Sequence, residues 1–329
     1  MNIKGEVQSF SIKSELFANC GFPMPAVRPL VAYIPPGADK GQRYPVLYAL
    51  ASWTSAGRTM LNWAPFKESL PERIERLVEE KIIPPCIIVC PDLYTDFGGS
   101  QYVNSSYFGP HADHIVREVI PFVERSLPVL KGSQHRGVFG ISSGGFGAIR
   151  LAIDFPGVFS SVGCHSGDMG FELVYGGDLV KLASGLAPYN LDVEAFVIDF
   201  LSAVKVPGDK VHIMMLLGMA GFYSPTESGY ELPINLATGQ IKDEVWSRWL
   251  AHDPVRIVQH KVEGLGLLKQ LYFECGYKDQ YNLHFGARQL AGELARQGID
   301  HEFLEFDDNH SGLAYRYDCS LPRLLRDLT

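Results

Sequence analysis

The stretch GVFGISSGGFGAIRLAIDFP, from Gly137 to Pro156, decides the fold. Its first residues form an apolar run typical of a buried strand, and an apolar stripe at helical spacing begins directly after its serines. Of the two serines, only Ser142 has glycines two positions before and after it, at Gly140 and Gly144. This spacing completes the pattern G-x-S-x-G and predicts a sharp strand-to-helix turn with Ser142 at its tip.

A turn of this kind brings a strand and a helix so close that the flanking positions have no room for a Cβ atom. The helix that follows offers free N–H groups and the positive end of its dipole, which stabilise an oxyanion beside the serine. We therefore interpret Ser142 as a nucleophile. The alternative is a Gly-Ser turn that only connects two elements.

A serine hydroxyl needs a base, usually a histidine oriented by a carboxylate. His310 follows a predicted strand near the C-terminal end of the sequence and is the expected base. Asp279 follows the preceding predicted strand, far enough before His310 for one helix and one strand, and is the expected acid. Asp168, which follows the strand ending Cys164-His165-Ser166, is the alternative acid.

Strand-like runs alternate with amphipathic segments, which predicts an α/β fold with a mostly parallel sheet and helices on both faces. Strands are expected over residues 5–16, 26–34, 44–52, 84–92, 136–142, 158–166, 268–276 and 300–307. Helices are expected over 71–81, over 110–130 with a kink or restart at Pro121, over 143–155, over 280–297 and at the C-terminal end. Residues 167–267 break the alternation with glycine turns, a Met-rich run and a Trp-bearing helix, so we expect a cap inserted into one domain of residues 1–329.

The composition, with 46% hydrophobic and 20% charged residues, is that of a soluble globular protein. A net charge of −8 disfavours nucleic acid and anionic membranes as partners. The first residues lack a signal-peptide pattern and no apolar run has membrane-spanning length, so the cytoplasm is the expected compartment. The six cysteines form no Cys-x-x-Cys pair, and His111 and His114 lack a third ligand, so we expect no metal site.

With Ser142, Asp279 and His310 assigned, the chain resembles the putative-esterase family of α/β-hydrolases. This family includes esterase D (S-formylglutathione hydrolase), the enterochelin esterases and the mycolyltransferases of the antigen 85 group. The similar stretches are VAYIPPG, RYPVLYAL, HIVREVIPFVE, GVFGISSGGFGAIRLAIDFPGVF, the turn from Gly276 to Asp279 and the histidine loop. The resemblance implies an α/β-hydrolase fold with Ser142 as nucleophile, Asp279 as acid and His310 as base. It also implies that the amide of Ser143 is one oxyanion donor, so Ser143→Ala is expected to be mild.

The chain departs from the family after the YPVLYAL strand, where members usually carry a His-Gly or Asp-Gly pair and this sequence reads Ala51-Ser52-Trp53. By position, the amide of Trp53 would be the second oxyanion donor and its side chain would wall the acyl pocket. In the cap, Phe222, Trp246 and Trp249 are expected to contact an apolar or bulky substrate. Packing of the cap onto the core explains these three residues equally well.

These expectations describe a serine hydrolase that cleaves carboxylic esters or thioesters through an acyl-enzyme and needs no cofactor. The expected partner is a small-molecule ester, and the sequence also allows a homo-oligomer. Three alternatives stay open: an acyltransferase with the same triad, a lactonase or amidase, and a catalytically silent hydrolase-fold protein that binds a ligand.

Overall fold

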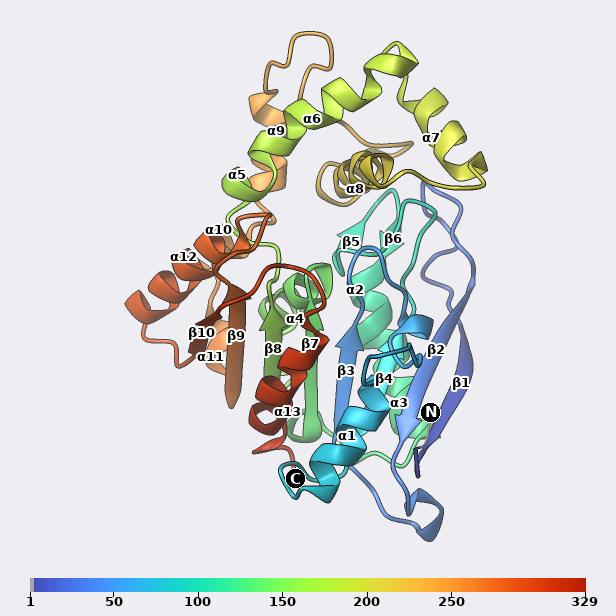
Figure 1. Cartoon of the computed structure of the whole chain (residues 1–329), viewed down its shortest axis with the longest axis vertical. Coiled ribbons are helices and arrows are strands. Elements are labelled where there is room, and N and C mark those ends of the chain that lie inside the picture. The colour runs from blue at the N-terminus through green and yellow to red at the C-terminus, as the bar shows by residue number, and fades with distance from the viewer. Residues whose placement is uncertain (1–2) are drawn as a thin grey trace.

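The computed structural model describes residues 3–329, apart from the side chain of Asp39, and its centre is an eight-stranded sheet (Figure 1). The strand order is β1-β2-β4-β3-β7-β8-β9-β10, and the strands from β4 to β10 in that order run parallel to one another. The strands β1 and β2 form an antiparallel edge. The bounds are β1 (Glu6–Lys13), β2 (Val27–Ile34), β3 (Val46–Leu50), β4 (Ile87–Pro91), β7 (Arg136–Ile141), β8 (Ser161–His165), β9 (Gln270–Gly276) and β10 (Glu302–Phe306). A separate short hairpin pairs β5 (Asn104–Ser105) with β6 (Gly109–Pro110).

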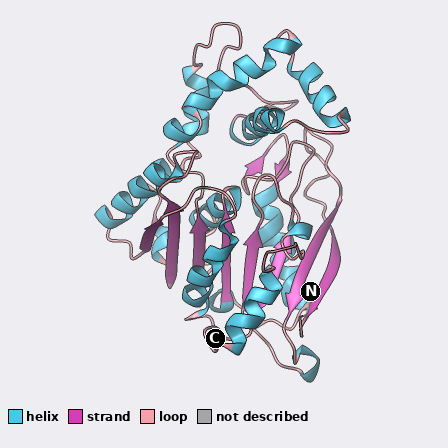
Figure 2. Ribbon diagram, viewed as in Figure 1, coloured by secondary structure: helices cyan, strands magenta, loops and turns pink. Residues whose placement is uncertain are grey.

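Helices cover both faces of this sheet (Figure 2). One face packs against α1 and α13, and the other packs against α3, α4, α11 and α12. The bounds of the helices outside the segment between β8 and β9 are α1 (Leu70–Glu79), α2 (His111–Asp113), α3 (Ile120–Ser126), α4 (Ser143–Asp154), α12 (Leu283–Arg296) and α13 (Tyr317–Leu325). Short 3₁₀ turns lie at Ala38–Lys40, Gly57–Thr59, Ser133–His135, Ala187–Tyr189 and Leu313–Arg316. None of the helices within residues 3–329 has the length and apolarity needed to span a membrane.

The strand β3 shows why the sequences of the central strands are uninterrupted apolar runs. All five of its residues are buried. Leu47 and Ala49 join the core under α1 and α13, whereas Tyr48 and Leu50 join the core on the opposite face. Because both faces are covered, neither set of alternating side chains meets water, and the sequence loses the polar alternation of a half-exposed strand.

The helical region expected over residues 110–130 runs from His111 to Ser126 as α2, a π-helical segment (His114–Val119) and α3. The restart expected at Pro121 is confirmed, because this proline lies in the first turn of α3. Pro121 has no N–H to donate, and it directly follows the π-helical turn in which the N–H of Ile120 donates to the carbonyl of Ile115.

The segment between β8 and β9 contains seven helices within the described residues, although the sequence suggested glycine turns over much of it. Their bounds are α5 (Phe171–Val174), α6 (Gly176–Leu186), α7 (Val193–Ser202), α8 (Gly208–Tyr223), α9 (Asp243–Leu250), α10 (Pro254–Ile257) and α11 (Glu263–Gly266). Gly176 and Gly177 occupy the first positions of α6, where a helix tolerates glycine. A Cβ at Gly185 would lie 2.5 Å from the Cδ1 atom of Ile213, so this glycine lets α6 approach α8. Glycine therefore serves helix packing at Gly185, whereas Gly170 and Gly239 have the positive φ of the expected turns.

Candidate active site

Ser142 joins β7 to α4 in a strained backbone conformation, with φ 58° and ψ −126°. Non-glycine residues rarely adopt a positive φ, and such strain is typical of functional sites. Hydrogen bonds to both backbone groups of Ser142 stabilise this conformation. The Ser142 N–H donates to the carbonyl of His165 at 2.9 Å, and the Ser142 carbonyl accepts from the N–H of Phe146 at 2.9 Å.

The two glycines of the motif have the steric purpose expected from the sequence. A Cβ at Gly140 would lie 2.5 Å from the carbonyl carbon of Gly144. A Cβ at Gly144 would collide with the carbonyl oxygen of Leu50, at the end of β3. Any side chain at these positions would therefore separate α4 from β7 or from β3 and would move Ser142.

The structure brings His310 and Asp279 together. The Nδ1 atom of His310 lies 2.7 Å from the Oδ2 atom of Asp279, whose side chain is fully buried. The other carboxylate oxygen of Asp279 accepts from the N–H of Tyr281 at 2.9 Å. A carboxylate on Nδ1 favours the tautomer with the proton on Nδ1, so Nε2 is free to accept a proton. Of the two candidate acids, Asp279 and not Asp168 is bonded to His310.

A cavity of about 940 Å³ joins four of the expected site residues, since Ser142, Ser143, His310 and Trp53 all line it. Asp279 lies behind His310 and is not part of the lining. The cavity wall combines the turn after β7, the loop after β3, the loop after β10 and the segment between β8 and β9. The carboxyl ends of parallel strands are the usual place for a site in an α/β fold.

The loop Ala51-Ser52-Trp53 is fixed by hydrogen bonds although it lacks the usual glycine. The Ser52 hydroxyl donates to the carbonyl of Ile141 at 3.1 Å, which ties the loop to the serine turn. The Tyr102 hydroxyl donates to the carbonyl of Ala51 at 2.7 Å. The N–H groups of Trp53 and Ser143 donate to no residue of the described chain, so both can meet an oxyanion.

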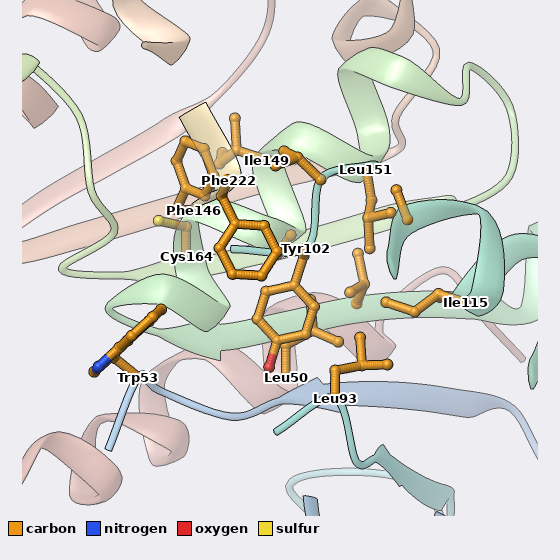
Figure 3. Packing of buried hydrophobic residues seen from close by; sticks show 14 of the residues in the cluster. Leu50, Trp53, Leu93, Tyr102, Ile115, Phe146, Ile149, Leu151, Cys164 and Phe222 are labelled. Atoms are coloured by element: carbon orange, nitrogen blue, oxygen red, sulfur yellow. The ribbon is translucent and has the colours of Figure 1, made fainter. Parts of the chain in front are cut away.

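Phe222, Trp246 and Trp249 lie outside this cavity, which corrects the expectation that they contact substrate. Phe222 is fully buried against Phe108 and lies within the apolar core (Figure 3). Trp249 is also buried, donates from Nε1 to the hydroxyl of Ser224 at 2.8 Å and packs against Trp246. These aromatic residues hold the helices of the segment together. A helix that is buried on several sides, such as α8, has apolar residues all round. Its sequence therefore does not show which of these residues face the substrate.

Several pocket residues were not identified as such from the sequence, among them Tyr175, Asp178, His212 and Tyr281. They come from α6, α8 and the turns before α6 and α12, and no short motif marks them. Met215 of the Met-rich run, in contrast, does line the cavity. His212 lies with its Nε2 atom 2.9 Å from the Oδ2 atom of Asp178 and stacks on Tyr281. The part of the cavity wall that these residues form is therefore polar and aromatic rather than purely apolar.

Asp168 also lines the cavity, and its position at the end of β8 is the signal that marked it in the sequence. Burial raises the pKa of its carboxyl to about 6, although a hydrogen bond from the Tyr175 hydroxyl at 2.8 Å and the nearby His310 lower it in part. The charge of Asp279 adds to the increase.

The histidines and cysteines outside the site have structural surroundings. His114 pairs through Nδ1 with Glu118 at 2.6 Å, and His111 contacts the carbonyl of Phe108. The six cysteines are free, and burial raises the pKa of the Cys86 thiol to about 12. Within residues 3–329, no group of His, Cys, Asp and Glu side chains is arranged to hold a metal ion.

Comparison with known proteins agrees with this architecture. A family model described as "Putative esterase" matches residues 24–316. An esterase of Mycobacterium tuberculosis is 35% identical over 99 residues, which is 28% of this chain and only 20% of the length of that relative. Over its whole length the chain is similar to a ferulic acid esterase, with a TM-score of 0.63, 17% identity and 99% of both chains covered.

It is also similar to an S-formylglutathione hydrolase from Agrobacterium tumefaciens, with a TM-score of 0.60, 13% identity, and 100% of this chain and 98% of that chain covered. At identities this low, the structural similarity shows a shared fold alone, the α/β-hydrolase fold. The family match covers most of the chain. The chain therefore belongs to the putative-esterase family of α/β-hydrolases.

Proposed function

We propose that this protein is a serine hydrolase that cleaves carboxylic ester or thioester bonds. His310 takes the proton of Ser142 through Nε2 while the serine oxygen attacks the acyl carbon. Asp279, on Nδ1, orients the ring and stabilises its protonated form. The amides of Ser143 and Trp53 stabilise the negative charge that develops on the carbonyl oxygen.

Collapse of the tetrahedral intermediate breaks the bond to the alcohol or thiol, which leaves with the proton held by His310. The acyl group remains on Ser142. His310 then takes a proton from water, the hydroxide attacks the acyl carbon, and the acid is released as Ser142 regains its proton. The residues of this chain supply every group that these steps need.

The observation that carries the proposal is the arrangement around Ser142. A strained serine at the start of α4 shares one cavity with a histidine that is bonded to a buried aspartate. Ser143 and Trp53, whose N–H groups donate to no residue of the described chain, line the same cavity. This is the combination of nucleophile, oriented base and oxyanion donors that acyl transfer requires.

Residues 167–267 are proposed to act as a cap within the single domain of residues 1–329. Figure 1 shows α6, α7, α8 and α9 gathered at the top of the view, beyond the ends of the strands. Side chains from this segment, including those of Tyr175, His212 and Met215, form part of the cavity wall. Substrate choice is therefore expected to depend on this segment.

The test is hydrolysis of p-nitrophenyl acetate, p-nitrophenyl butyrate and an acyl thioester by the wild type and by Ser142→Ala. We expect Ser142→Ala to lose at least about 10³-fold in kcat, because the remaining amides and binding groups provide only residual catalysis. Ser143→Ala is the matched control, since it keeps the amide and removes only a neighbouring hydroxyl. Full activity of Ser142→Ala would overturn the proposal.

A further inference from the structure

The cavity contains a carboxylate that the proposed hydrolysis does not use. Asp168 follows β8 and lines the same cavity as Ser142 and His310, yet it is only 6% exposed. It is not the partner of His310, because Asp279 occupies Nδ1 of that ring. A buried carboxylate that lines this cavity but takes no part in the proposed hydrolysis therefore needs a role of its own.

Asp168 has no cation to offset the cost of burying it. Its Oδ2 atom accepts from the Tyr175 hydroxyl at 2.8 Å, and the carboxylate also accepts a hydrogen bond from the side chain of Gln101. No lysine, arginine or histidine among the described residues forms an ion pair with it. A carboxylate can accept about four hydrogen bonds, and leaving a buried charge without an ion partner costs several kcal/mol in general. The open capacity of Asp168 lies on the wall of the cavity.

Two other charged side chains of the cavity wall are already paired. Asp178 lies 2.9 Å from His212 and 2.7 Å from Lys181. Arg73 pairs with Glu68 at 3.1 Å and with Asp318. Lys67 also lines the cavity, but it is exposed to solvent and forms no ion pair with Asp168 among the described residues. The buried carboxylate of the cavity wall without an ion partner is thus Asp168, whose own charge favours a hydrogen-bond donor and disfavours an anionic group.

We propose that Asp168 is a specificity-determining residue that accepts a hydrogen bond from a hydroxyl or ammonium group on the ester bound at Ser142. This inference rests on the proposed function and narrows its substrate class. Esters that carry such a donor are preferred over esters with a plain alkyl end. Esters that carry a carboxylate at the same place are disfavoured, because two adjacent carboxylates repel each other.

The experiment compares p-nitrophenyl esters that differ only in a terminal CH₃, OH or NH₃⁺ group: butyrate, 3-hydroxypropanoate and 3-aminopropanoate, with a longer series from heptanoate. The same three ends on the alcohol of an acetate ester show whether the donor lies in the acyl or the alcohol part. The OH and NH₃⁺ arms separate the two kinds of donor. At pH 7.5 we expect kcat/KM for one donor-ended ester to exceed that of its methyl-ended match by about tenfold, the value of one hydrogen bond to a charged group.

Asp168→Asn keeps the size of the side chain and an acceptor for Tyr175 but removes the charge. We expect it to reduce the donor-to-methyl ratio of kcat/KM by about tenfold. Asp154→Asn is the matched control, because Asp154 ends α4, pairs with Arg150 and Lys261, and does not line the cavity. It should keep the ratio. Equal rates for methyl-ended and donor-ended esters in the wild type, or an unchanged ratio in Asp168→Asn, would refute the role of Asp168.

A measurement on the wild type keeps the inference testable if Asp168→Asn does not fold. The pKa of Asp168 is raised to about 6, so its charge is lost between pH 7.5 and 5. The ratio of kcat/KM for the OH-ended ester to that for its methyl-ended match should fall as the pH is lowered over this range. A ratio that does not change with pH would contradict the inference. The titratable groups that face Asp168 are Tyr175, Tyr223, Tyr281, Cys164, Asp279 and His310.

Burial raises the pKa values of the three tyrosines and of Cys164, so these groups stay protonated throughout the range. The comparison is a ratio within a pair because Ser142, His310 and Asp279 act on both esters of a pair alike. Failure of the proposed function looks different from failure of this inference. In the first case, Ser142-dependent hydrolysis is absent for every ester. In the second, hydrolysis depends on Ser142 but ignores the terminal group.

Discussion

Ser142 occupies a backbone conformation that serine adopts only at a cost, because its positive φ brings Cβ close to the neighbouring backbone. Glycine has no such penalty. We expect Ser142→Gly to raise the free energy of unfolding by about 1 kcal/mol while it abolishes hydrolysis. Urea denaturation of Ser142→Gly and Ser142→Ala measures this difference. A glycine variant no more stable than the alanine variant would show that the turn stores no strain.

The neighbouring Ser143 has a second role that the sequence did not reveal. Its hydroxyl is fully buried and accepts a hydrogen bond from the Nε2 atom of Gln101 at 3.0 Å. Ser143→Ala therefore removes one of two partners of the buried Gln101 amide, which also donates to Asp168, and we expect a loss of about 1 kcal/mol in unfolding free energy. Activity should stay within a few-fold of wild type at a temperature where the variant is folded, because the Ser143 N–H is retained. Loss of activity without loss of stability would contradict this division of roles.

At the scale of residues, the sequence predicted those site residues that belong to a short sequence motif. Gly140, Ser142 and Gly144 are recognisable because a turn constrains positions two residues apart. The contact between Ser143 and Gln101 spans 42 residues and leaves no such pattern. Asp168 was identified by its place after a strand, but the structure shows it bonded to Tyr175 and not to His310.

At the scale of elements, a buried polar cluster joins β8, β9 and α13 behind the serine turn. Glu274 lies 2.7 Å from Nδ1 of His165 and accepts from Nε of Arg316 at 2.9 Å. The other ring nitrogen of His165 lies 2.9 Å from the hydroxyl of Ser320. Arg316 follows the loop of His310, so the cluster fixes the element that carries the proposed base to the strand that precedes Asp279.

Glu274→Gln should destabilise the protein by roughly 3–5 kcal/mol, because it leaves Arg316 and His165 without their carboxylate. Burial alone would raise the pKa of Glu274, but the hydrogen bonds from His165 and Arg316 outweigh burial and lower it to about 2. A carboxyl whose pKa falls on folding stabilises the fold above its unfolded pKa of about 4.3. That contribution disappears as the pH falls from there toward 2.

Unfolding free energies of the wild type and Glu274→Gln, measured between pH 7 and pH 2.5, test this cluster. The two curves should lie furthest apart above pH 5 and converge below pH 4. Parallel curves would mean that the carboxylate of Glu274 is not what stabilises the cluster. No sequence pattern predicts this cluster, since Glu274 sits within an apolar strand and Arg316 lies 42 residues later.

At the scale of the whole molecule, the segment between β8 and β9 contacts the loop Ala51-Ser52-Trp53 through Trp53. A Cβ at Gly98 would lie 2.6 Å from the indole of Trp53, and a Cβ at Gly218 of α8 would collide with the same indole. The ring is thus enclosed between a loop of the core and a helix of the proposed cap. The amide of the same residue is the proposed second oxyanion donor.

Gly218→Ala should therefore displace α8 or Trp53, with an expected loss of about 1–3 kcal/mol in stability and a fall of several-fold in kcat/KM for ester hydrolysis. Gly177→Ala is the control in the neighbouring helix α6, because nothing lies within 4 Å of a Cβ at Gly177 and this residue does not line the cavity. Thermal unfolding and p-nitrophenyl butyrate hydrolysis compare the two. Equal activity in both variants would argue that the proposed cap does not influence the oxyanion loop.

The fold was predictable from the sequence where strands and helices alternate, because the helices show an apolar stripe at helical spacing and the central strands are short, uninterrupted apolar runs. The antiparallel pair at residues 5–16 and 26–34 is confirmed as β1 and β2, and the helix expected over 280–297 is confirmed as α12. The segment 167–267 was harder to predict because its helices pack on several sides and use glycine for close approach. The same packing explains why Phe222 and Trp249 were assigned to the substrate and lie in the core instead.

The central claim is that Ser142 is an activated nucleophile, and covalent labelling tests it most directly. The protein is treated with a fluorophosphonate probe and digested, and mass spectrometry locates the modified residue. We predict one label, on Ser142, that is present in the wild type and in Ser143→Ala and absent from Ser142→Ala. A folded wild type that stays unlabelled, or a label on any other residue that persists in Ser142→Ala, would contradict the account.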